Sequence, residues 1–507
     1  MHALLQPEVY DYLAVVDLWR LRRASKPCLD ACRTALSRKK RPLLAGGAHG
    51  EAFELDWSTC RWEPLPALGS ASLARQWQQI AATVGGAGSE RAVAAAVAAA
   101  PAERARGSRR GSIFARLSPL LWEQRDGSTV CAGGVAPWHP RVTCAAPGPA
   151  LRSSGHLPTL AVERLPPPPP RLPPRACGGE RAHARDAPTN AHSSGWQLVE
   201  GVELRHRRDG AAVVLRDPPL DVDADADVEG ACAMVLGGGT AEEQMWGAFR
   251  VCARATSATE EVHMRGPVAV AGGGNAATAT TTIAGGVAGR LEAALVQAGP
   301  SMRHSRMHFA ASRLRSVGRG AVIVAGGSSL DGRPLRCAEL LLPRGGKWVS
   351  LQARMSRERV GCCGAELPDG RFAVFGGGSN PVVGWHQTAE VLVPAVPRPD
   401  DADKFGVEWR PLPPPRAAVG EGGRTVALTA EGQPLKVSRT ASELLVIGSV
   451  HAWRQYGERT PGVVIMLVSA LRSKCGDARS KEEYRWLTLP SPPPKWWRGM
   501  SARISVD

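Results

Sequence analysis

One pattern recurs along the chain, a short apolar run that ends in a pair of glycines. The clearest copies are residues 321–327, which read AVIVAGG, and residues 372–377, which read FAVFGG. Such a run predicts a buried strand, and its glycines permit positive φ angles and a close approach of neighbouring backbone. The pairs are Gly46 and Gly47, Gly133 and Gly134, Gly237 and Gly238, Gly272 and Gly273, Gly326 and Gly327, and Gly376 and Gly377, and a seventh, degenerate copy keeps Gly448.

Two further elements follow the glycines in a fixed order. An Ala-Glu-apolar run that ends in proline contains Glu339 in one copy and Glu390 in the next. A Trp-x-x-Leu segment then supplies a large flat side chain that can fill the space between neighbouring sheets. Because one such sheet cannot bury both of its faces alone, the sequence predicts several stacked antiparallel sheets. The tryptophans are Trp62, Trp348, Trp409 and Trp486.

This order of elements resembles the kelch repeat, a unit of about fifty residues that pairs two glycines with a downstream tryptophan. Gly327 and Gly377 are 50 residues apart. The resemblance is best over residues 300–450, whereas the glycine steps between residues 85 and 300 are irregular and the usual tyrosine is missing. It implies an all-β fold, namely a kelch-type β-propeller of six or seven four-stranded blades with a small N-terminal α-helical segment.

The predicted domains are a helical segment at residues 1–40 and the propeller at residues 41–494. Two low-complexity stretches rich in glycine, alanine, arginine or proline predict disordered inserts at 85–111 and 164–192. Since propellers often close by joining their two ends, the segment around Trp486 is predicted to complete the blade that begins near residue 41.

The N-terminal segment has a different character. Leu18 and Leu21 have the spacing of an amphipathic helix, for which Asp17 is a suitable N-cap. Residues 4–26 resemble an F-box, although a glutamine separates its opening leucine from proline and the segment is short. The resemblance implies docking to a Skp-type adaptor and a cullin, and the alternative is a helical hairpin that only packs against the propeller. The residues implied in docking are Leu5, Pro7, Val9, Leu13, Leu18 and Leu21.

Charge and hydropathy bear on the class of partner. The net charge is +16, but most of the 63 basic residues are scattered arginines and none forms a block interleaved with aromatic side chains. We therefore expect no nucleic-acid binding. The longest apolar run, residues 463–468, is far too short to span a bilayer, and no secretory signal is visible. The sequence predicts a cytoplasmic or nuclear protein without membrane contact.

Motifs for catalysis and for metal binding were sought in the same way, and the sequence predicts neither. His304 and His308 lie four residues apart but lack the glutamate of a zinc-protease helix. The 12 cysteines include no Cys-x-x-Cys pair. The acidic stretch 221–229 does not fit a calcium loop and is predicted to be a solvated turn. A basic connection is predicted to be a solvated loop, with contact to an acidic partner as the alternative, and it holds Arg354, Arg357 and Arg359.

These observations predict a protein-interaction adaptor rather than an enzyme, with no cofactor. Its function would be substrate recognition for a cullin-type (SCF) ubiquitin ligase, in which the propeller holds an unknown substrate protein near the ubiquitin carrier. The alternative is a kelch-repeat protein-binding scaffold without ligase linkage. A propeller enzyme is the third and least favoured hypothesis.

Overall fold

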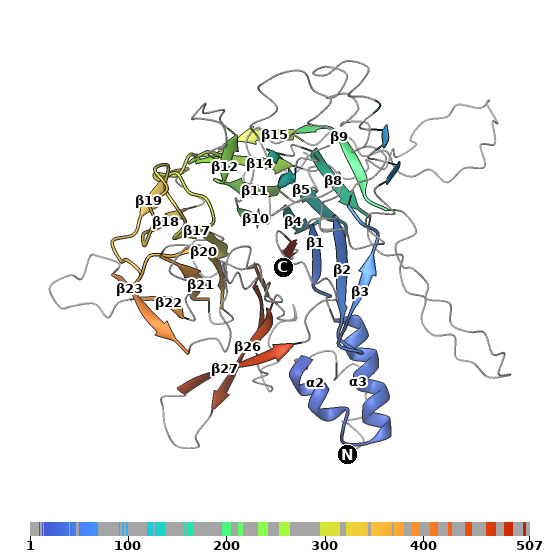
Figure 1. The fold of residues 1–507 in the computed structure, drawn as a ribbon. Coiled ribbons are helices and arrows are strands. Elements are labelled where there is room, and N and C mark those ends of the chain that lie inside the picture. The colour runs from blue at the N-terminus through green and yellow to red at the C-terminus, as the bar shows by residue number, and fades with distance from the viewer. Residues whose placement is uncertain are drawn as a thin grey trace, which may run out of the picture.

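The chain folds mostly into antiparallel β-sheet, with two short helices near its N-terminus (Figure 1). The computed structural model describes residues 10, 13, 15–39, 41–46, 50–68, 91, 94–95, 98–99, 119–124, 127–137, 156–158, 161–166, 195–203, 211–215, 232–241, 253–263, 295–314, 321–342, 346–367, 370–379, 388–394, 406–413, 424–427, 442–448, 463–472, 481–489 and 500–502.

Six four-stranded sheets make up the described β structure, numbered here in chain order. The first sheet has the spatial order β28 (Met500–Ala502), β1 (Leu43–Gly46), β2 (Glu51–Asp56) and β3 (Arg61–Leu65). The second sheet is β4 (Leu120–Glu123), β5 (Thr129–Ala132), β8 (Ala161–Leu165) and β9 (Gln197–Glu203). The third sheet is β10 (Ala211–Leu215), β11 (Cys232–Leu236), β14 (Thr259–His263) and β15 (Leu295–Ala298).

The last three sheets use consecutive strands. The fourth is β16 (Ala310–Leu314), β17 (Ala321–Ala325), β18 (Ala338–Leu341) and β19 (Trp348–Ser350). The fifth is β20 (Val360–Glu366), β21 (Phe372–Gly378), β22 (Ala389–Pro394) and β23 (Val407–Leu412). The sixth is β24 (Arg424–Ala427), β25 (Ser442–Gly448), β26 (Val463–Arg472) and β27 (Lys481–Leu489). Two small pairs accompany them, β6 (Val135–Pro137) with β7 (His156–Pro158) and β12 (Gly239–Ala241) with β13 (Ala253–Ala255).

The first strands of neighbouring sheets contact one another in a closed order. β28 contacts β4, β4 contacts β10, and the series continues through β16, β20 and β24 back to β28. Figure 1 shows the sheets following one another around the molecule in this order. Each sheet therefore has one neighbour on either side, and β28 joins the first sheet to the second and the sixth.

The glycine pairs lie at the ends of second strands. Gly326 and Gly327 follow β17 with φ of 70° and 90°, values that favour glycine. A Cβ atom on Gly326 would lie 2.6 Å from the carbonyl oxygen of Arg359, at the start of the next sheet. The pair is thus required where two sheets approach closely. Gly46, Gly133, Gly134, Gly237, Gly238, Gly376 and Gly377 also have positive φ.

Two of the predicted glycine pairs are only partly accounted for. Gly47 lies outside the described residues, and so do Gly272 and Gly273. The strands β14 and β15, which precede and follow Gly272 and Gly273 in the chain, are the third and fourth strands of one sheet and pair directly. The other six copies of the pattern belong to the second strands of the six sheets.

The four predicted tryptophans lie on the fourth strands of their sheets. Trp62 on β3 and Trp348 on β19 are buried, and the indole Nε1 of Trp348 donates to the carbonyl oxygen of Pro300 at 2.8 Å. Trp409 on β23 meets Phe372 of its own sheet edge to face, with ring centroids 6.2 Å apart. The fourth, Trp486, lies on β27.

The C-terminal strand of the first sheet differs from the prediction. Trp486 belongs to β27, which pairs with β26 in the sixth sheet. The segment that pairs with β1 is instead β28, through Leu44 opposite Ala502 and Gly46 opposite Met500. The first sheet therefore includes residues beyond the predicted domain boundary at 494. Likewise β8 continues to Leu165, so residues 164 and 165 belong to a strand and not to the predicted insert at 164–192. The predicted insert at 85–111 falls largely outside the described residues.

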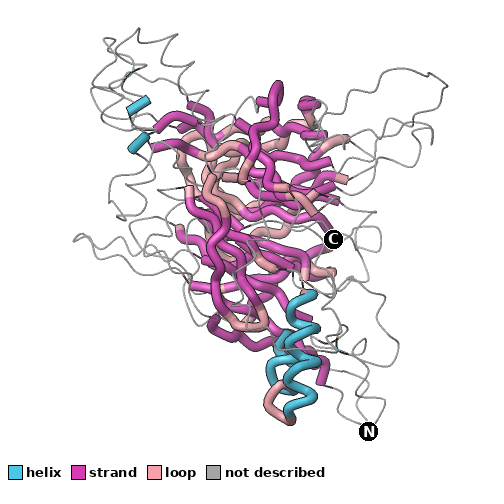
Figure 2. Tube along the Cα trace, turned by 90° about the vertical axis from the view of Figure 1, so that its right-hand side faces the viewer, coloured by secondary structure: helices cyan, strands magenta, loops and turns pink. Residues whose placement is uncertain are grey.

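The helices α2 (Val15–Leu21) and α3 (Lys26–Arg38) lie together at one end of the β structure (Figure 2). Ser25 caps α3, because its side-chain oxygen accepts a hydrogen bond from the backbone N–H of Cys28 at 3.3 Å. Among the described residues, no helix has both the length and the apolar character needed to cross a bilayer. The predicted all-β class is confirmed, whereas the kelch-type propeller stays a prediction.

Candidate protein-docking surface

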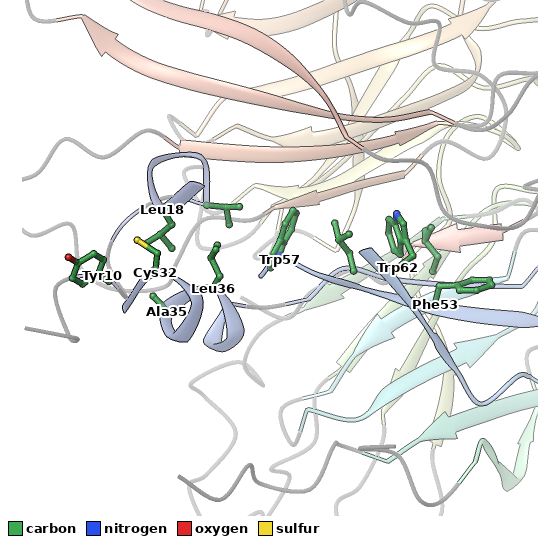
Figure 3. Packing of buried hydrophobic residues seen from close by; sticks show 11 residues of the cluster. Tyr10, Leu18, Cys32, Ala35, Leu36, Phe53, Trp57 and Trp62 are labelled. Carbon is green, nitrogen blue, oxygen red and sulfur yellow. The ribbon is translucent and has the colours of Figure 1, made fainter. Parts of the chain in front are cut away.

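The N-terminal helices share one hydrophobic core with the first sheet. Leu18 of α2 and Leu36 of α3 are fully buried, and they belong to the same cluster as Leu55 and Trp57, at the end of β2 (Figure 3). Trp19 adds a polar link, since its indole Nε1 donates to the carbonyl oxygen of Trp57 at 3.0 Å. Burying side chains of this size contributes about 1.5–3 kcal/mol each. The helices are therefore fixed to the sheet.

The residues that the F-box resemblance implied in docking differ in how exposed they are. Leu18 has no exposed surface, so it is a core residue and is not available to a partner in this structure. Leu13 is half-buried and packs against the same cluster. Leu21, at the end of α2, is 36% exposed. Leu5, Pro7 and Val9 lie outside the described residues.

An exposed corner surrounds Leu21, and residues 20–26 are called the helical corner below. Leu21 and Ala24 are its apolar members, and Arg20, Arg23 and Lys26 are exposed beside them. Arg20 pairs with Asp17 at 3.2 Å, and the Arg20 side chain remains largely exposed. The corner thus combines apolar side chains with positive charge, a combination that suits an acidic, partly apolar protein surface.

A second exposed leucine lies on the connection between β17 and β18. Leu330 is 57% exposed at the tip of a tight turn in which Ser329 N–H donates to the carbonyl oxygen of Arg333 at 2.9 Å. Asp331 and Arg333 pair across this turn at 2.8 Å, and both are largely exposed. The turn holds its own shape, so Leu330 can be changed without disturbing a core.

The basic connection before β20 is not uniformly solvated. Arg354 and Arg357 are exposed, as predicted for a loop, but Arg359 is fully buried. Its guanidinium donates to Glu390 Oε1 at 2.6 Å from Nη2 and to the carbonyl oxygen of Gly376 at 2.5 Å from Nη1. The prediction of a solvated loop is therefore wrong for Arg359, which binds the third strand of its own sheet.

The fourth sheet repeats the same arrangement. Arg306 is fully buried, and its Nη2 donates to Glu339 Oε1 at 2.7 Å while Nη1 donates to the carbonyl oxygen of Gly326 at 2.7 Å. Burial alone would raise the pKa of Glu339. The positive charge of Arg306, with hydrogen bonds from Arg306, Arg303 and His304, outweighs burial and holds that pKa below its ordinary value. A buried carboxylate is kept charged in this way.

The position of the glutamate follows a register rule. In four sheets a buried glutamate on the third strand lies opposite the residue two places before the first glycine. In the first sheet the same register position holds Phe53, opposite Leu44. The four glutamates are Glu163, Glu260, Glu339 and Glu390.

The pairing of Arg306 with Glu339 and of Arg359 with Glu390 was not predicted from the sequence, where contact with an acidic partner was only the alternative for Arg359. A signal was nevertheless present, because Glu339 and Glu390 lie inside apolar strands, and a buried carboxylate requires a cation or several hydrogen-bond donors. What the sequence did not contain was the pairing of each glutamate with an arginine 31 or 33 residues earlier. That relation depends on how the first and third strands meet in space.

The two histidines do not form a metal site. His304 Nδ1 lies 2.7 Å from Glu339 Oε1, on the exposed side of the buried pair. His308 has a positive φ of 56° and lies at the entry to β16. Within the residues that the structure describes, no group of three or more His, Cys, Asp and Glu side chains is placed to hold a metal ion. The acidic stretch 221–229 lies outside the described residues.

Comparisons with known proteins give similarity of structure only. No family profile and no curated protein sequence matches the chain. A solved structure titled "Structure of YjhT" is 8% identical, with a TM-score of 0.35, and the match covers 73% of this chain and 97% of that one. A fungal alcohol oxidase of the AA5 family, in complex with copper, is 10% identical with a TM-score of 0.34, over 82% and 69% of the two chains.

The comparison corrects the prediction that the chain is not an enzyme. An alcohol oxidase is among the proteins with a similar arrangement of strands, so the β architecture does not exclude catalysis. At these TM-scores, the similarity assigns no activity, metal or residue role to this chain. The exclusion of enzymes is therefore withdrawn.

Proposed function

We propose that the chain is a protein-binding adaptor built on a six-bladed kelch-type propeller. Six four-stranded sheets whose first strands contact one another in a closed order support this proposal. The glycine pairs at the ends of the second strands and the tryptophans on the fourth strands support the kelch type. The connections between strands would then present a substrate-binding face.

The helical corner is the proposed docking site for a Skp-type adaptor of a cullin ubiquitin ligase. The observation that carries this proposal is the shared core of α2, α3 and the first sheet, which leaves Leu21 exposed while Leu18 is buried. A ligase adaptor works by holding its substrate at a set distance and orientation from the ubiquitin carrier. A helical segment fixed rigidly to the substrate-binding domain meets that requirement.

The second candidate is a kelch scaffold without ligase linkage. It is favoured by the burial of Leu18, because a segment that only caps the first sheet needs no apolar surface of its own. The two candidates differ in what they require of Leu21. Docking requires this side chain at an interface, whereas a scaffold leaves it without a partner.

The deciding experiment is retention of the full-length chain on an immobilised Skp-type subunit. Leu21→Asp should abolish retention, because a carboxylate would be placed in the apolar centre of the interface. Leu330→Asp is the control, since it places the same charge on another exposed leucine, on a turn of the fourth sheet. Equal retention of both variants, or no retention of the parent chain, would support the scaffold instead.

A further inference from the structure

The turn between α2 and α3 carries a second feature besides its apolar residue. Residues 22–25 read Arg-Arg-Ala-Ser, so that Ser25 has arginines three and two places before it. Protein kinases choose substrates in part by such charge patterns, and one large class selects arginine at these two positions. The same arginine spacing before a serine occurs once more, at residues 109–112, which read Arg-Arg-Gly-Ser and lie outside the described residues.

The geometry of the turn leaves Ser25 accessible. Ala24, Ser25 and Lys26 are all exposed, and the backbone of Ser25 is extended, with φ of −161° and ψ of 165°. The extended backbone is confined to Ser25, because residues 22–24 form a turn and α3 begins at Lys26, so the turn offers a kinase an exposed hydroxyl beside two arginines. The Ser25 oxygen accepts one hydrogen bond, the 3.3 Å contact from Cys28 N–H, which lies at the long end of the usual range.

We propose that Ser25 is the acceptor of a phosphoryl group from a serine kinase that selects arginine upstream. In the reaction the Ser25 Oγ attacks the γ-phosphorus of ATP and the bond from that phosphorus to the bridging oxygen breaks. ADP leaves, and the hydroxyl proton passes to the catalytic base of the kinase. The product is a phosphate ester at the N-cap of α3.

The surroundings of Ser25 define what this phosphate does. A phosphate carries a charge of about −1.5 to −2 at neutral pH. At the N-cap of the 13-residue helix α3 it meets the positive end of the helix dipole and the backbone N–H of Cys28, which already donates to the Ser25 side chain. Arg22, Arg23 and Lys26 lie within three residues of it in sequence. The modification therefore stabilises the start of α3 and offsets up to about half of the positive charge of the helical corner, which comes from Arg20, Arg22, Arg23 and Lys26.

Cys28 provides a local reporter for the modification. A hydrogen bond from the Ser25 hydroxyl, and then one from Tyr10, hold the pKa of the Cys28 thiol below its ordinary value. Once Ser25 is esterified it has no hydroxyl proton to donate, and its new negative charge opposes the thiolate. Alkylation of Cys28 by iodoacetamide should therefore slow severalfold after phosphorylation. Local unfolding around Cys28 would have the opposite effect, because a more exposed thiol reacts faster.

The test uses the native full-length chain with Ser112→Ala, a purified arginine-selecting serine kinase and Mg-ATP, with sites mapped by peptide mass spectrometry. We expect phosphate on Ser25, its loss in Ser25→Ala, and a severalfold slower transfer when Arg22 and Arg23 are both changed to Gln. Ser37 is the matched control, because it lies on the same helix without an arginine pair before it. It should stay unmodified.

Three results would overturn the proposal. They are absence of phosphate on Ser25 in the native chain, transfer that occurs only after heat denaturation, and equal labelling of Ser37. The assay contains no Skp-type subunit, so its outcome is independent of the docking proposed above. The expected effect of the phosphate on docking, in contrast, rests on the proposed function: retention on the Skp-type subunit should fall, because the corner loses up to about half of its positive charge.

Discussion

The first and fifth sheets are both four-stranded and antiparallel, but they hold their third strands by different chemistry. In the fifth sheet, Glu390 on the third strand is buried and takes two hydrogen bonds from the guanidinium of Arg359. In the first sheet the equivalent register position holds Phe53, which joins the apolar cluster under the two helices. One sheet is fastened by a buried ion pair and the other by packing against helices.

The difference teaches where an extra element can be added to a repeated fold. The two members of a buried ion pair neutralise and hydrogen-bond each other within one sheet, so the pair needs no partner from a neighbouring element. An apolar side chain at the same place can be shared with a neighbour, and Phe53, Leu55 and Trp57 are shared with α2 and α3. The helices thus attach to a sheet that has an apolar residue where four others carry glutamate.

Removing one partner of a buried pair should give the largest effect. Arg359→Ala leaves Glu390 charged and buried without its cation, and we expect a loss of about 3–5 kcal/mol in the free energy of unfolding. Urea unfolding of the full chain measures it. The double variant Arg359→Met, Glu390→Leu should recover most of the loss, because an apolar pair needs no partner charge. A single variant as stable as the parent would contradict this account.

Truncating the helix–sheet core should give a loss of similar or smaller size, confined to one end of the molecule. Leu36→Ala removes a fully buried side chain and should cost about 2–5 kcal/mol. Cys32 is buried in the same cluster and should become reactive toward a thiol reagent. Cys362, buried in the fourth and fifth sheets, is the internal reference and should stay protected. Equal reactivity of Cys32 and Cys362 would show that the helix–sheet core does not unfold separately from the other sheets.

Glycine substitutions should separate conformational strain from steric conflict. Gly326→Ala and Gly332→Ala both place a Cβ at positive φ, which costs about 1–2 kcal/mol. At Gly332 nothing lies within 4 Å of the added atom, whereas at Gly326 it meets the carbonyl oxygen of Arg359. Gly326→Ala should therefore lower the thermal midpoint further than Gly332→Ala. Equal shifts would mean that the two sheets can move apart at this point.

The smallest effect should be the acid dependence of the fourth sheet. The pKa of Glu339 is lowered in the folded chain, so its contribution to stability is present above its ordinary pKa and is lost as pH falls through the lowered value. The parent chain should lose stability over that acidic range, and Glu339→Gln should lose less. Asp331→Asn is the control, because its ion pair is exposed and should change the slope little. If the free energy of unfolding changed with pH in the same way for the parent and for Glu339→Gln, Glu339 would not be the source of the acid dependence.

The sequence predicted those elements whose cause is local. A glycine pair after a short apolar run can be recognised within one copy of the repeat. These patterns located the second strand of each of the six sheets, and the structure places positive φ angles at the described glycine pairs. The partners of Glu339 and Glu390 were not predicted, because each arginine lies on a connection whose polar and charged residues are typical of an exposed loop. Burial of Leu18 was missed for a related reason: helical spacing shows that one face is apolar but not what covers it.

The sequence also did not identify which C-terminal segment pairs with β1. The sequence indicated that a C-terminal strand returns to the first sheet, but Trp-Leu-Thr-Leu at 486–489 carried a stronger strand signal than Met-Ser-Ala at 500–502. A three-residue strand has too little pattern to be recognised alone, and only its backbone partner β1 identifies it.

The pairing of β28 with β1 also orders events during protein synthesis. Within the first sheet, β1 is synthesised long before β28, so β1 has no partner on that side until residues 500–502 have been made. An unpaired strand edge is a site of association with other chains. A chain that terminates before Met500 lacks this partner, so the edge of β1 is open to association with other chains.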